Sequence, residues 1–424
     1  MKKLLFAVVP LLMVASACQV GVSMWTSCSP AADGNPFGTD GEYVLACQGG
    51  EWVPIMTIGE YLRIRGGMPT IIGSLPEQPS RIAGGDAHSC ARATGSGRVE
   101  CWGANDEGQL GNGTEDDSSS PVAVSGLTTA TSLALGYSHS CALLADTTVR
   151  CWGVNDQGQL GNATNVGSTT PKAVVGLNGA VAVDSSHEHT CALLDNGGVR
   201  CWGRNNNGQL GNGTTTSSNR PVAVLGITNA VDVAVGREHT CATLADGGVR
   251  CWGSNDEGQL GNGTRVGSKT PVGVSGVSSA GSISAGKQHT CATGPYGIVW
   301  CWGDGSVGQL GQGAYADSTT AVRVKGLVGA RQVAAGARHN CTLQSDSTLR
   351  CWGKNDDGQL GNGTLDKANA PVKALGGNYS EVAAGTYHTC ARAAGATDWC
   401  WGFNKYGQLG NGNKVSSHHP VRVV

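Results

Sequence analysis

The chain has 424 residues and a net charge of −2, from 29 basic and 31 acidic residues. This balance provides no basic field to attract nucleic acid or anionic lipid, so we expect no nucleic-acid partner. Glycine is abundant, with 67 residues, which favours tight turns and short strands over long helices. Seventeen cysteines are too many for a reducing compartment unless they bind metal.

The first 18 residues have the layout of an export signal. "MKK" is a short positive region, "LLFAVVPLLMV" is an apolar run, and "ASAC" ends at Cys18. The pattern resembles a bacterial lipoprotein signal. It therefore implies that residues 1–17 are removed and that Cys18 carries a lipid, with cleavage to an unmodified Cys18 as the alternative. We expect a protein of the cell envelope, at the outer membrane or cell surface, or a secreted one, which meets a membrane only through that lipid.

Residues 18–53 are expected to form a small disulfide-bonded module. They contain Cys28 and Cys47, separated by a loop rich in glycine and proline and followed by "CQGGEWVP". In this interpretation Trp52 covers a Cys28–Cys47 bridge. The module would be either a small binding domain or a collar, and residues 54–68 would be a linker.

The rest of the chain, residues 69–424, is a repeat of about fifty residues marked by "CWG". Each "CWG" cysteine follows another cysteine by about ten residues. The seven pairs are Cys90 and Cys101, Cys141 and Cys151, Cys191 and Cys201, Cys241 and Cys251, Cys291 and Cys301, Cys341 and Cys351, and Cys390 and Cys400. A period of this length indicates a solenoid or a propeller.

The stretch between paired cysteines is typical of a β-hairpin. In "HTCATLADGGVRC" the turn lies at 246–248, so Cys241 should face Cys251 and Thr243 should face Val249. Facing residues have Cα atoms roughly 4.5–5.5 Å apart, which suits a disulfide worth about 2–3 kcal/mol. Zinc is the alternative, because each unit also has His-x-Cys. Three ligands fall short of a structural site, however, and we expect no metal and no cofactor.

Further strands complete each unit. "PVAVSGL" (121–127) alternates as a strand does, and 131–144 is a longer strand interrupted by Gly136. Four short strands per unit without a helix signal predict an all-β fold, a seven-bladed propeller of antiparallel blades. An open solenoid is the alternative, but it needs atypical repeats at its ends.

The two ends of the array suggest how the ring closes. "PTIIGSL" (69–75) matches the "PVAVSGL" position, and "PVRVV" (420–424) offers the same strand again. Eight such strands therefore serve seven hairpins. We expect the C-terminal copy to join the first blade and the 69–75 copy to be displaced or to pack outside it.

The repeat "GxxHTCAL…VRCWGxNxxGQLGNGT" resembles that of the regulator of chromosome condensation family, over residues 69–424. The resemblance implies a seven-bladed propeller. Members include a guanine-nucleotide exchange factor for a nuclear GTPase, a plant ultraviolet photoreceptor and a secreted bacterial β-lactamase inhibitor that binds through one face of the ring. An export signal, paired cysteines and no basic tail distinguish this chain from the exchange factor, so we do not expect exchange activity.

Tryptophan and histidine each recur once per unit. We expect the tryptophans to pack between blades, although an excitonic cluster is conceivable in this family, and the histidines to be hydrogen-bonded structural residues rather than ligand-binding ones. "GQLGNG" lacks the Lys-Ser/Thr of a phosphate loop and suits a turn. No nucleophile–base pair or carboxylate pair stands out, so we expect a non-enzymatic protein.

The variable positions of the repeat point to one face. The "GxxH" corner and the "NxxG" loop should share one end of the ring, because they flank the paired hairpin strands. Variable, mixed-charge loops on a fixed frame are typical of a protein-binding surface, with ordinary solvated variation as the alternative. The candidates for this face are Tyr137, Arg237, Glu238, Lys287, Arg338, Tyr387, Lys405 and Tyr406. The tyrosines and arginines among them are the expected anchors, because Tyr and Arg are enriched at hot spots.

The leading hypothesis is therefore an exported, non-enzymatic scaffold that binds a protein partner of unknown identity, in an unknown oligomeric state. The alternative is a glycan or cell-wall adhesin, which predicts aromatic platforms on the face. Unit five departs from the repeat, with Gly305 in place of asparagine and Ala321 in place of proline. Drift and local adaptation of the face both explain that departure.

Overall fold

The computed structural model describes residues 37–39, 43–48, 51–57, 81–93 and 96–424. The expected signal, Cys18, Cys28 and the strand at 69–75 lie outside these residues. The chain divides into two compact units, 1–72 and 73–424, and each is considered by itself. In the part of the chain that the structure describes, no helix is long and apolar enough to cross a bilayer.

The described part of the first unit is a three-stranded antiparallel sheet. It consists of β1 (Phe37–Thr39), β2 (Tyr43–Gln48) and β3 (Glu51–Thr57). Cys47 lies opposite Trp52 in the β2–β3 ladder. β3 runs past position 53, so regular structure continues into the stretch that was expected to be a linker.

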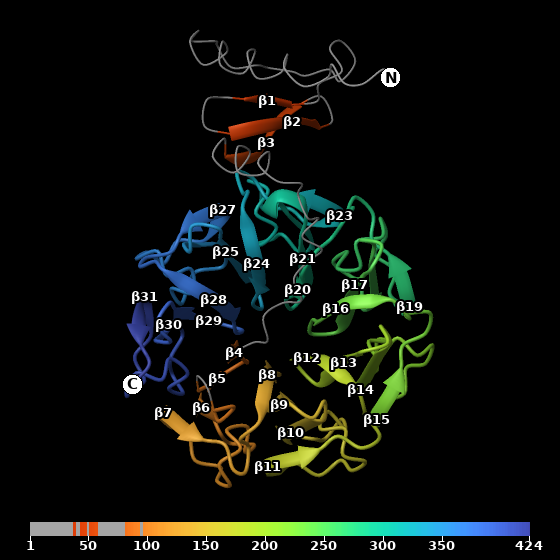
Figure 1. Ribbon diagram of the computed structural model, residues 1–424, viewed down its shortest axis with the longest axis vertical. Coiled ribbons are helices and arrows are strands. Elements are labelled where there is room, and N and C mark those ends of the chain that lie inside the picture. Colours follow the sequence, from red (N-terminus) through yellow and green to blue (C-terminus); the bar gives the residue numbers. More distant parts are fainter. Residues whose placement is uncertain (1–36, 40–42, 49–50, 58–80, 94–95) are drawn as a thin grey trace, which may run out of the picture. The chain divides into compact units, whose positions relative to one another are not determined.

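The second unit is a ring of seven four-stranded antiparallel sheets, which confirms the predicted propeller (Figure 1). Blades one and two are β4 (Ile82–Gly84), β5 (His88–Arg92), β6 (Val99–Gly103), β7 (Ser118–Ala123), and β8 (Ala130–Leu135), β9 (His139–Leu144), β10 (Val149–Gly153), β11 (Ser168–Ala173). Blades three and four are β12 (Ala180–Ser186), β13 (His189–Leu194), β14 (Val199–Gly203), β15 (Ser218–Ala223), and β16 (Ala230–Val235), β17 (His239–Leu244), β18 (Val249–Gly253), β19 (Ser268–Gly273).

Blades five and six are β20 (Ile283–Ala285), β21 (His289–Thr293), β22 (Val299–Gly303), β23 (Ser318–Arg323), and β24 (Ala330–Ala335), β25 (His339–Gln344), β26 (Leu349–Gly353), β27 (Ala368–Lys373). Blade seven is β28 (Tyr379–Ala384), β29 (His388–Ala393), β30 (Asp398–Gly402) and β31 (Ser417–Arg422). A short 3-10 turn, η1 (Pro295–Gly297), joins β21 to β22. The first strand of each blade lies toward the centre of the ring and the fourth lies at its rim (Figure 1).

The second and third strands of each blade form the predicted disulfide-bonded hairpin. In blade four Cys241 lies opposite Cys251 and Thr243 lies opposite Val249, as expected. All seven blades of the ring carry the corresponding disulfide, with Cα atoms 4.0–4.1 Å apart. These bonds restrict the unfolded chain unit by unit, and disulfides of this density are typical of an oxidising compartment.

The glycine of "CWG" is needed where the hairpin meets the rim strand. The register between the third and fourth strands shifts between Cys151 and Gly153. Gly153 has φ +99°, and a Cβ at this position would collide with the backbone carbonyl of Ser138. Only glycine adopts this conformation without strain, so the motif fixes the bend that separates the hairpin from the rim.

Tryptophans fill the spaces between blades, as predicted. Trp152 is fully buried, and its Nε1 donates a 2.9 Å hydrogen bond to the carbonyl of Gln109 in the preceding blade. The tryptophans of the other six "CWG" motifs, each 0–1% exposed, make the equivalent bond at the same distance. The indole thus combines a large buried area with a satisfied donor at every blade junction.

The repeated histidines join the same junctions. Nε2 of His139 lies 3.0 Å from Oγ1 of Thr190 in the next blade, and that hydroxyl donates in turn to the carbonyl of Gln159. Because the single hydroxyl proton is used there, the histidine is the donor, and Nδ1 is left without a proton. The other six histidines pair with a Ser, Thr or Asn side chain in the same way, at 2.7–2.9 Å. Their expected structural role is confirmed.

The ring does not close as the sequence suggested. β31 pairs with β30 in blade seven, and blade one consists of the consecutive strands β4 to β7. The expectation that the C-terminal strand joins the first blade is therefore wrong. The "PVAV" strand belongs to the hairpin before it, so the copy at 420–424 completes its own blade.

Blades one and seven instead meet through the lateral contacts used elsewhere in the ring. Ser89 Oγ lies 2.7 Å from Nε2 of His388, and the amide of Gly412 donates to the carbonyl of Ser119 at 2.9 Å. An apolar cluster fills this junction, formed by Ile82, Ala91, Trp102, Cys390, Cys400 and Leu409. The seam therefore has the chemistry of an ordinary blade junction.

Candidate binding face

Two loops of each blade lie side by side at one end of the ring. In blade two, Gly153 is paired with His139, and the amide of Val154 donates to the carbonyl of Ser138 at 2.9 Å. We call this end the corner face. It comprises the corners at 86–87, 137–138, 187–188, 237–238, 287–288, 337–338 and 386–387, and the loops at 104–107, 154–157, 204–207, 254–257, 304–307, 354–357 and 403–406. The predicted candidate residues all belong to it.

A buried asparagine fixes the 104–107 type of loop in six of the seven blades. Oδ1 of Asn155 accepts from the amide of Leu160, and Nδ2 donates to the carbonyls of Thr164 and Val166, at 2.9–3.0 Å. Blades one, three, four, six and seven repeat this arrangement. The variable side chains next to the asparagine therefore stand on a rigid frame.

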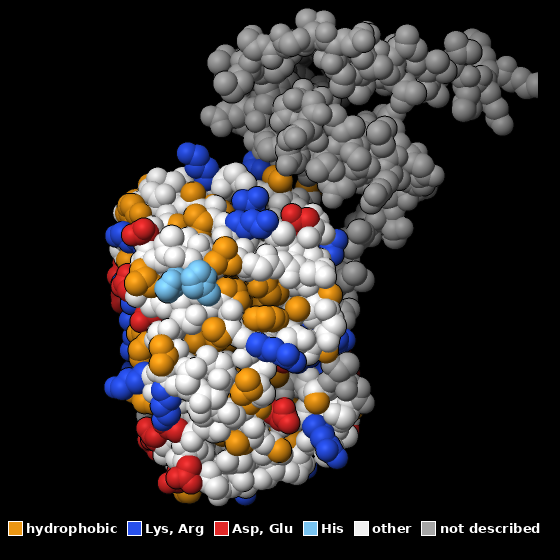
Figure 2. Space-filling view, turned by 90° about the vertical axis from the view of Figure 1, so that its left-hand side faces the viewer, with side chains coloured by type: hydrophobic (Ala, Val, Ile, Leu, Met, Phe, Trp, Pro, Cys, Tyr) orange, Lys and Arg blue, Asp and Glu red, His pale blue; other side chains and the backbone are white. Residues whose placement is uncertain are grey.

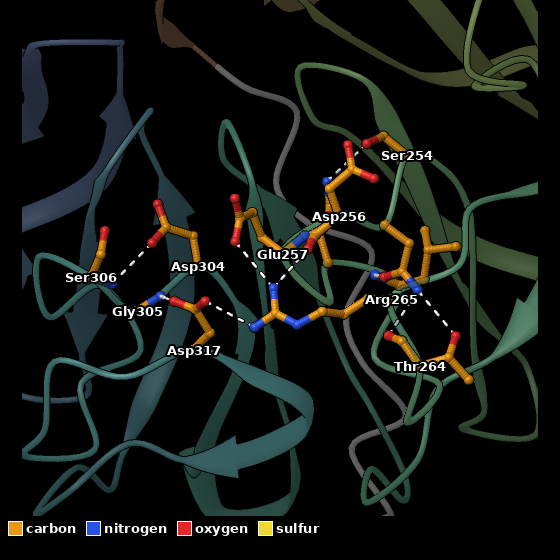
Figure 3. A network of polar contacts seen from close by, with 12 residues as sticks. Ser254, Asp256, Glu257, Thr264, Arg265, Asp304, Gly305, Ser306 and Asp317 are labelled. Carbon is orange, nitrogen blue, oxygen red and sulfur yellow. Dashed lines mark hydrogen bonds and ion pairs between the residues drawn. The ribbon is translucent and has the colours of Figure 1, made fainter.

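Blade five replaces that frame. The carbonyl of Ala316 occupies the space where a Cβ of Gly305 would lie, and Oδ1 of Asp317 accepts from the amide of Gly305 at 3.0 Å. Beside it Arg265 of blade four bridges the blades, since its guanidinium lies 3.2 Å from Glu257 and 3.0 Å from Asp317 (Figure 3). The departure is thus a local rearrangement stabilised by a neighbouring loop.

The centre of the face opens into a channel of about 690 Å³, lined by the inner strands of the blades. The first residue of each corner surrounds its mouth: Asp86, Tyr137, His187, Arg237, Lys287, Ala337 and Thr386. Backbone hydrogen bonds link five of these corners to the next blade, with the amides of Asp86, Tyr137, Arg237, Lys287 and Thr386 as donors at 3.0–3.4 Å. The mouth is therefore held in place by the backbone itself.

Two carboxyl groups in the channel wall were missed by the sequence analysis. Asp184 accepts from the amide of Val235 at 2.7 Å, and Asp232 accepts from that of Ile283 at 3.0 Å, each across a blade junction. Burial raises the pKa of Asp184 to about 6 and that of Asp232 to about 7. They occupy different positions of the repeat, so no spacing signal marks them.

An aromatic cluster lies on blade seven. The rings of Tyr387 and Phe403 are 6.1 Å apart, and those of Phe403 and Tyr406 are 6.4 Å apart, both edge to face. Lys354 lies 5.1 Å from the Tyr387 ring centre, and Lys405 lies 5.5 Å from that of Tyr406. The structure thus brings together three predicted residues, Tyr387, Lys405 and Tyr406. Sequence reasoning missed Phe403, although it follows "CWG" directly at a variable position.

Tyr137 stands apart from this cluster, on blade two. Its ring is half exposed and lies 5.4 Å from that of His187 on blade three. Glu188 follows His187 and forms an ion pair of 2.7 Å with Arg204. His187 has φ +38°, and it follows Ser186 where most units have glycine. The corner of blade three therefore departs from the repeat and presents a side chain that packs on Tyr137.

The predicted basic residues differ in their surroundings. Arg338 forms an ion pair of 3.0 Å with Asp304 of blade five, whose side chain is 6% exposed. Arg237 and Lys287 stand at the channel mouth with Glu238 beside them. Burial lowers the pKa of Lys287, and the charges of Arg237 and Arg338 lower it further. Arg237, Lys287 and Arg338 thus form one arc over blades four to six.

The described residues on the side of the ring seen in Figure 2 form no charged patch that would indicate a binding site. On the side seen in Figure 2, basic and acidic side chains are scattered among uncharged ones, without a patch of one sign. Within the described residues, no group of three or more His, Cys, Asp or Glu side chains could hold a metal ion. On the corner face, by contrast, three aromatic rings of blade seven lie together with two lysines.

Comparison with known proteins supports the fold. The family described as the RCC1-like domain matches residues 58–333 and 130–424. Yeast RCC1 (Prp20), in its crystal structure with Kap60, is 23% identical with a TM-score of 0.69, covering 83% of this chain and 85% of that one.

Two further solved structures are similar. Prp20p of Saccharomyces cerevisiae, described with its binding to Gsp1p and histones, is 25% identical with a TM-score of 0.68 and coverage of 83% and 87%. Human WBSCR16 is 26% identical with a TM-score of 0.67 and coverage of 74% and 86%. The sequences of curated proteins give no match.

Proposed function

Since the chain belongs to the family of RCC1-like domains, we propose that it is a non-enzymatic scaffold that holds a protein partner on the corner face. The similar Prp20 structures are described with protein partners, Kap60 in one and Gsp1p and histones in the other. Fold likeness alone does not transfer a partner. The argument therefore rests on the side chains of this face.

The aromatic cluster of blade seven carries the proposal. Tyr387 is 38% exposed and contacts Phe403, which contacts Tyr406, and a lysine lies against each tyrosine. Packed tyrosines bury much area on binding at a small entropic cost, since their rotamers are already fixed. This arrangement suits the energetic centre of a protein interface.

The cellular setting of the proposal follows from the cysteines. Seven disulfides indicate an oxidising environment. We propose export through the signal at 1–17, with a lipid on Cys18 and a Cys28–Cys47 module at 18–53. Residues 54–68, of which β3 includes the first four, would then connect this module to the propeller. The partner would then be a protein of the cell envelope or of the surrounding medium.

Affinity capture tests the proposal. The full chain, fixed by a C-terminal tag, is incubated with envelope extract, and the bound proteins are identified by mass spectrometry. We expect a saturable partner, lost on Tyr387→Ala with Arg338→Ala. The matched control is Tyr296→Asn with Arg331→Ala, which removes a tyrosine and an arginine from the turn end of the hairpins. Equal capture by the two double variants would contradict the proposal.

Glycan binding is a second candidate because the same cluster offers aromatic rings to a sugar. The rings meet edge to face at 66° and 70°, however, so they do not form a flat stacking platform. Binding to purified cell-wall polysaccharide that is lost on Tyr406→Ala would favour the adhesin over the protein-binding scaffold.

A further inference from the structure

Among the described residues, Arg237 and Lys287 at the channel mouth lack the ion pair that three other cations of the corner face form. Arg204 pairs with Glu188, Arg338 with Asp304, and Lys354 with Asp356, at 2.7–3.4 Å. Within the described part of the chain, Arg237 and Lys287 form no ion pair and no side-chain hydrogen bond. Nε of Arg237 is buried without a hydrogen-bond partner, as are those of Arg204 and Arg338, so it is the ion pair formed by those two arginines that distinguishes them from Arg237.

The two cations are neighbours on a rigid support. They occupy equivalent corners of blades four and five, and both line the channel. The amide of Arg237 donates to the carbonyl of Gly286 at 3.4 Å, and that of Lys287 donates to the carbonyl of Ala337 at 3.1 Å. Their backbones are therefore fixed before any ligand arrives, which lowers the entropic cost of binding.

The mouth of the channel is polarised. Asp304 and Glu238 are the acids that act on Lys287, and the carboxylate of Asp304 also forms an ion pair with Arg338. Asp86 lines the opposite side of the mouth, on blade one. Positive charge thus gathers at blades four and five, and negative charge lies across the opening.

We propose that Arg237 and Lys287 form a carboxylate-binding subsite that receives an Asp or Glu side chain of the protein partner. This inference rests on the proposed function and adds the chemistry of the partner's central contact. The guanidinium presents planar paired donors that match a carboxylate, and the lysine ammonium supplies a further charged donor. In the partly enclosed mouth these contacts are screened less than on an open surface.

An octaglutamate peptide serves as the probe, with binding to the full chain measured by calorimetry at low salt. We expect Arg237→Gln and Lys287→Gln each to weaken binding about tenfold. Asp86→Asn should tighten it, because it removes a repulsive charge. Arg250→Gln, which removes an exposed arginine of the same blade away from the mouth, should change the dissociation constant less than about twofold.

Two results would overturn the inference. One is binding of octaglutamate that Arg237→Gln and Lys287→Gln leave unchanged, in variants that circular dichroism shows to be folded. The other is binding of inorganic phosphate as tight as that of the peptide, which would assign the site to a free anion.

Affinity capture separates this inference from the proposed function. If the double variant Arg237→Gln/Lys287→Gln still captures the partner that Tyr387→Ala/Arg338→Ala loses, the scaffold function stands and the carboxylate subsite is wrong. If the double variant loses that partner as well, the subsite is supported.

Discussion

The indole Nε1 of Trp102 donates a 2.9 Å hydrogen bond to the carbonyl of Gln408, a residue 306 positions later in the chain. This bond crosses the seam where the first blade meets the last. It repeats the bond from Trp252 to Gln209 between blades three and four. The two junctions share their side-chain contacts and differ in that a peptide connection links only blades three and four.

Trp102→Phe should therefore destabilise the ring more than Trp252→Phe. Both changes remove one buried hydrogen bond and leave a small cavity, at a cost of about 1–3 kcal/mol. Only at the seam can the weakened blades separate without a chain connection to hold them. Urea unfolding at pH 7 measures both variants. Identical unfolding free energies would show that the seam is no weaker than the other junctions.

The ring should lose stability as the pH falls below about 6.5. Burial lowers the pKa of His139 and His239 to about 3 and that of His388 to about 4, and it lowers the pKa of the other four junction histidines as well. Between these pKa values and the ordinary histidine pKa, the unfolded chain binds more protons than the folded ring. The free energy of unfolding is therefore highest above the pKa of histidine in the unfolded chain, and it decreases as the pH falls toward the pKa in the folded ring. Each histidine contributes about 1.4 kcal/mol per pH unit in that window.

The urea midpoint from pH 7 to pH 4 tests this dependence. His139→Gln should reduce the slope by about one histidine's share, because glutamine can donate to Thr190 without titrating. His419→Gln, at an exposed position of the rim strand β31, is the control and should leave the slope unchanged. A urea midpoint that stays constant between pH 6.5 and pH 4 would contradict the prediction that burial keeps these histidines neutral in the folded ring.

Restoring the repeat sequence in blade five should destabilise the propeller. Gly305→Asn introduces the residue found in the other six units, but the carbonyl of Ala316 already fills the space of its Cβ. The loop at 313–317 must move, and we expect a loss of about 1–3 kcal/mol in thermal unfolding. Asn255→Gly in blade four is the counterpart and should also destabilise, since it removes the bonds to Leu260, Thr264 and Val266. A more stable Gly305→Asn protein would contradict this account.

The hairpin and its disulfide could be predicted because both depend on local rules. The turn at 246–248 fixes which residues face each other, and Cys241 then has a single partner in reach. The assignment of the fourth strand failed, because a periodic sequence has no marked beginning. Periodicity allows the strand at 121–127 to belong to the hairpin before it or to the one after it. In the structure β7 pairs with β6, so this strand belongs to the hairpin before it.

The position of the binding face could be predicted, but the pairing of its side chains could not. Strand order places every "GxxH" corner at the same end of the ring. It does not reveal that Arg338 reaches Asp304 on the neighbouring blade, whereas Arg237 forms no ion pair with any residue that the structure describes. The same holds for Phe403, whose contact with Tyr387 depends on the geometry of one blade. Which charged side chains on neighbouring blades form ion pairs can therefore be learned only from the structure.

Because the seam repeats the contacts of every other junction, the ring itself does not dictate where the polypeptide starts. Any of the six connections between a rim strand and the next inner strand, such as the one from Ala123 to Ala130, could host the chain ends and leave every blade with its four strands. The contacts between blades therefore do not determine which blade comes first along the chain.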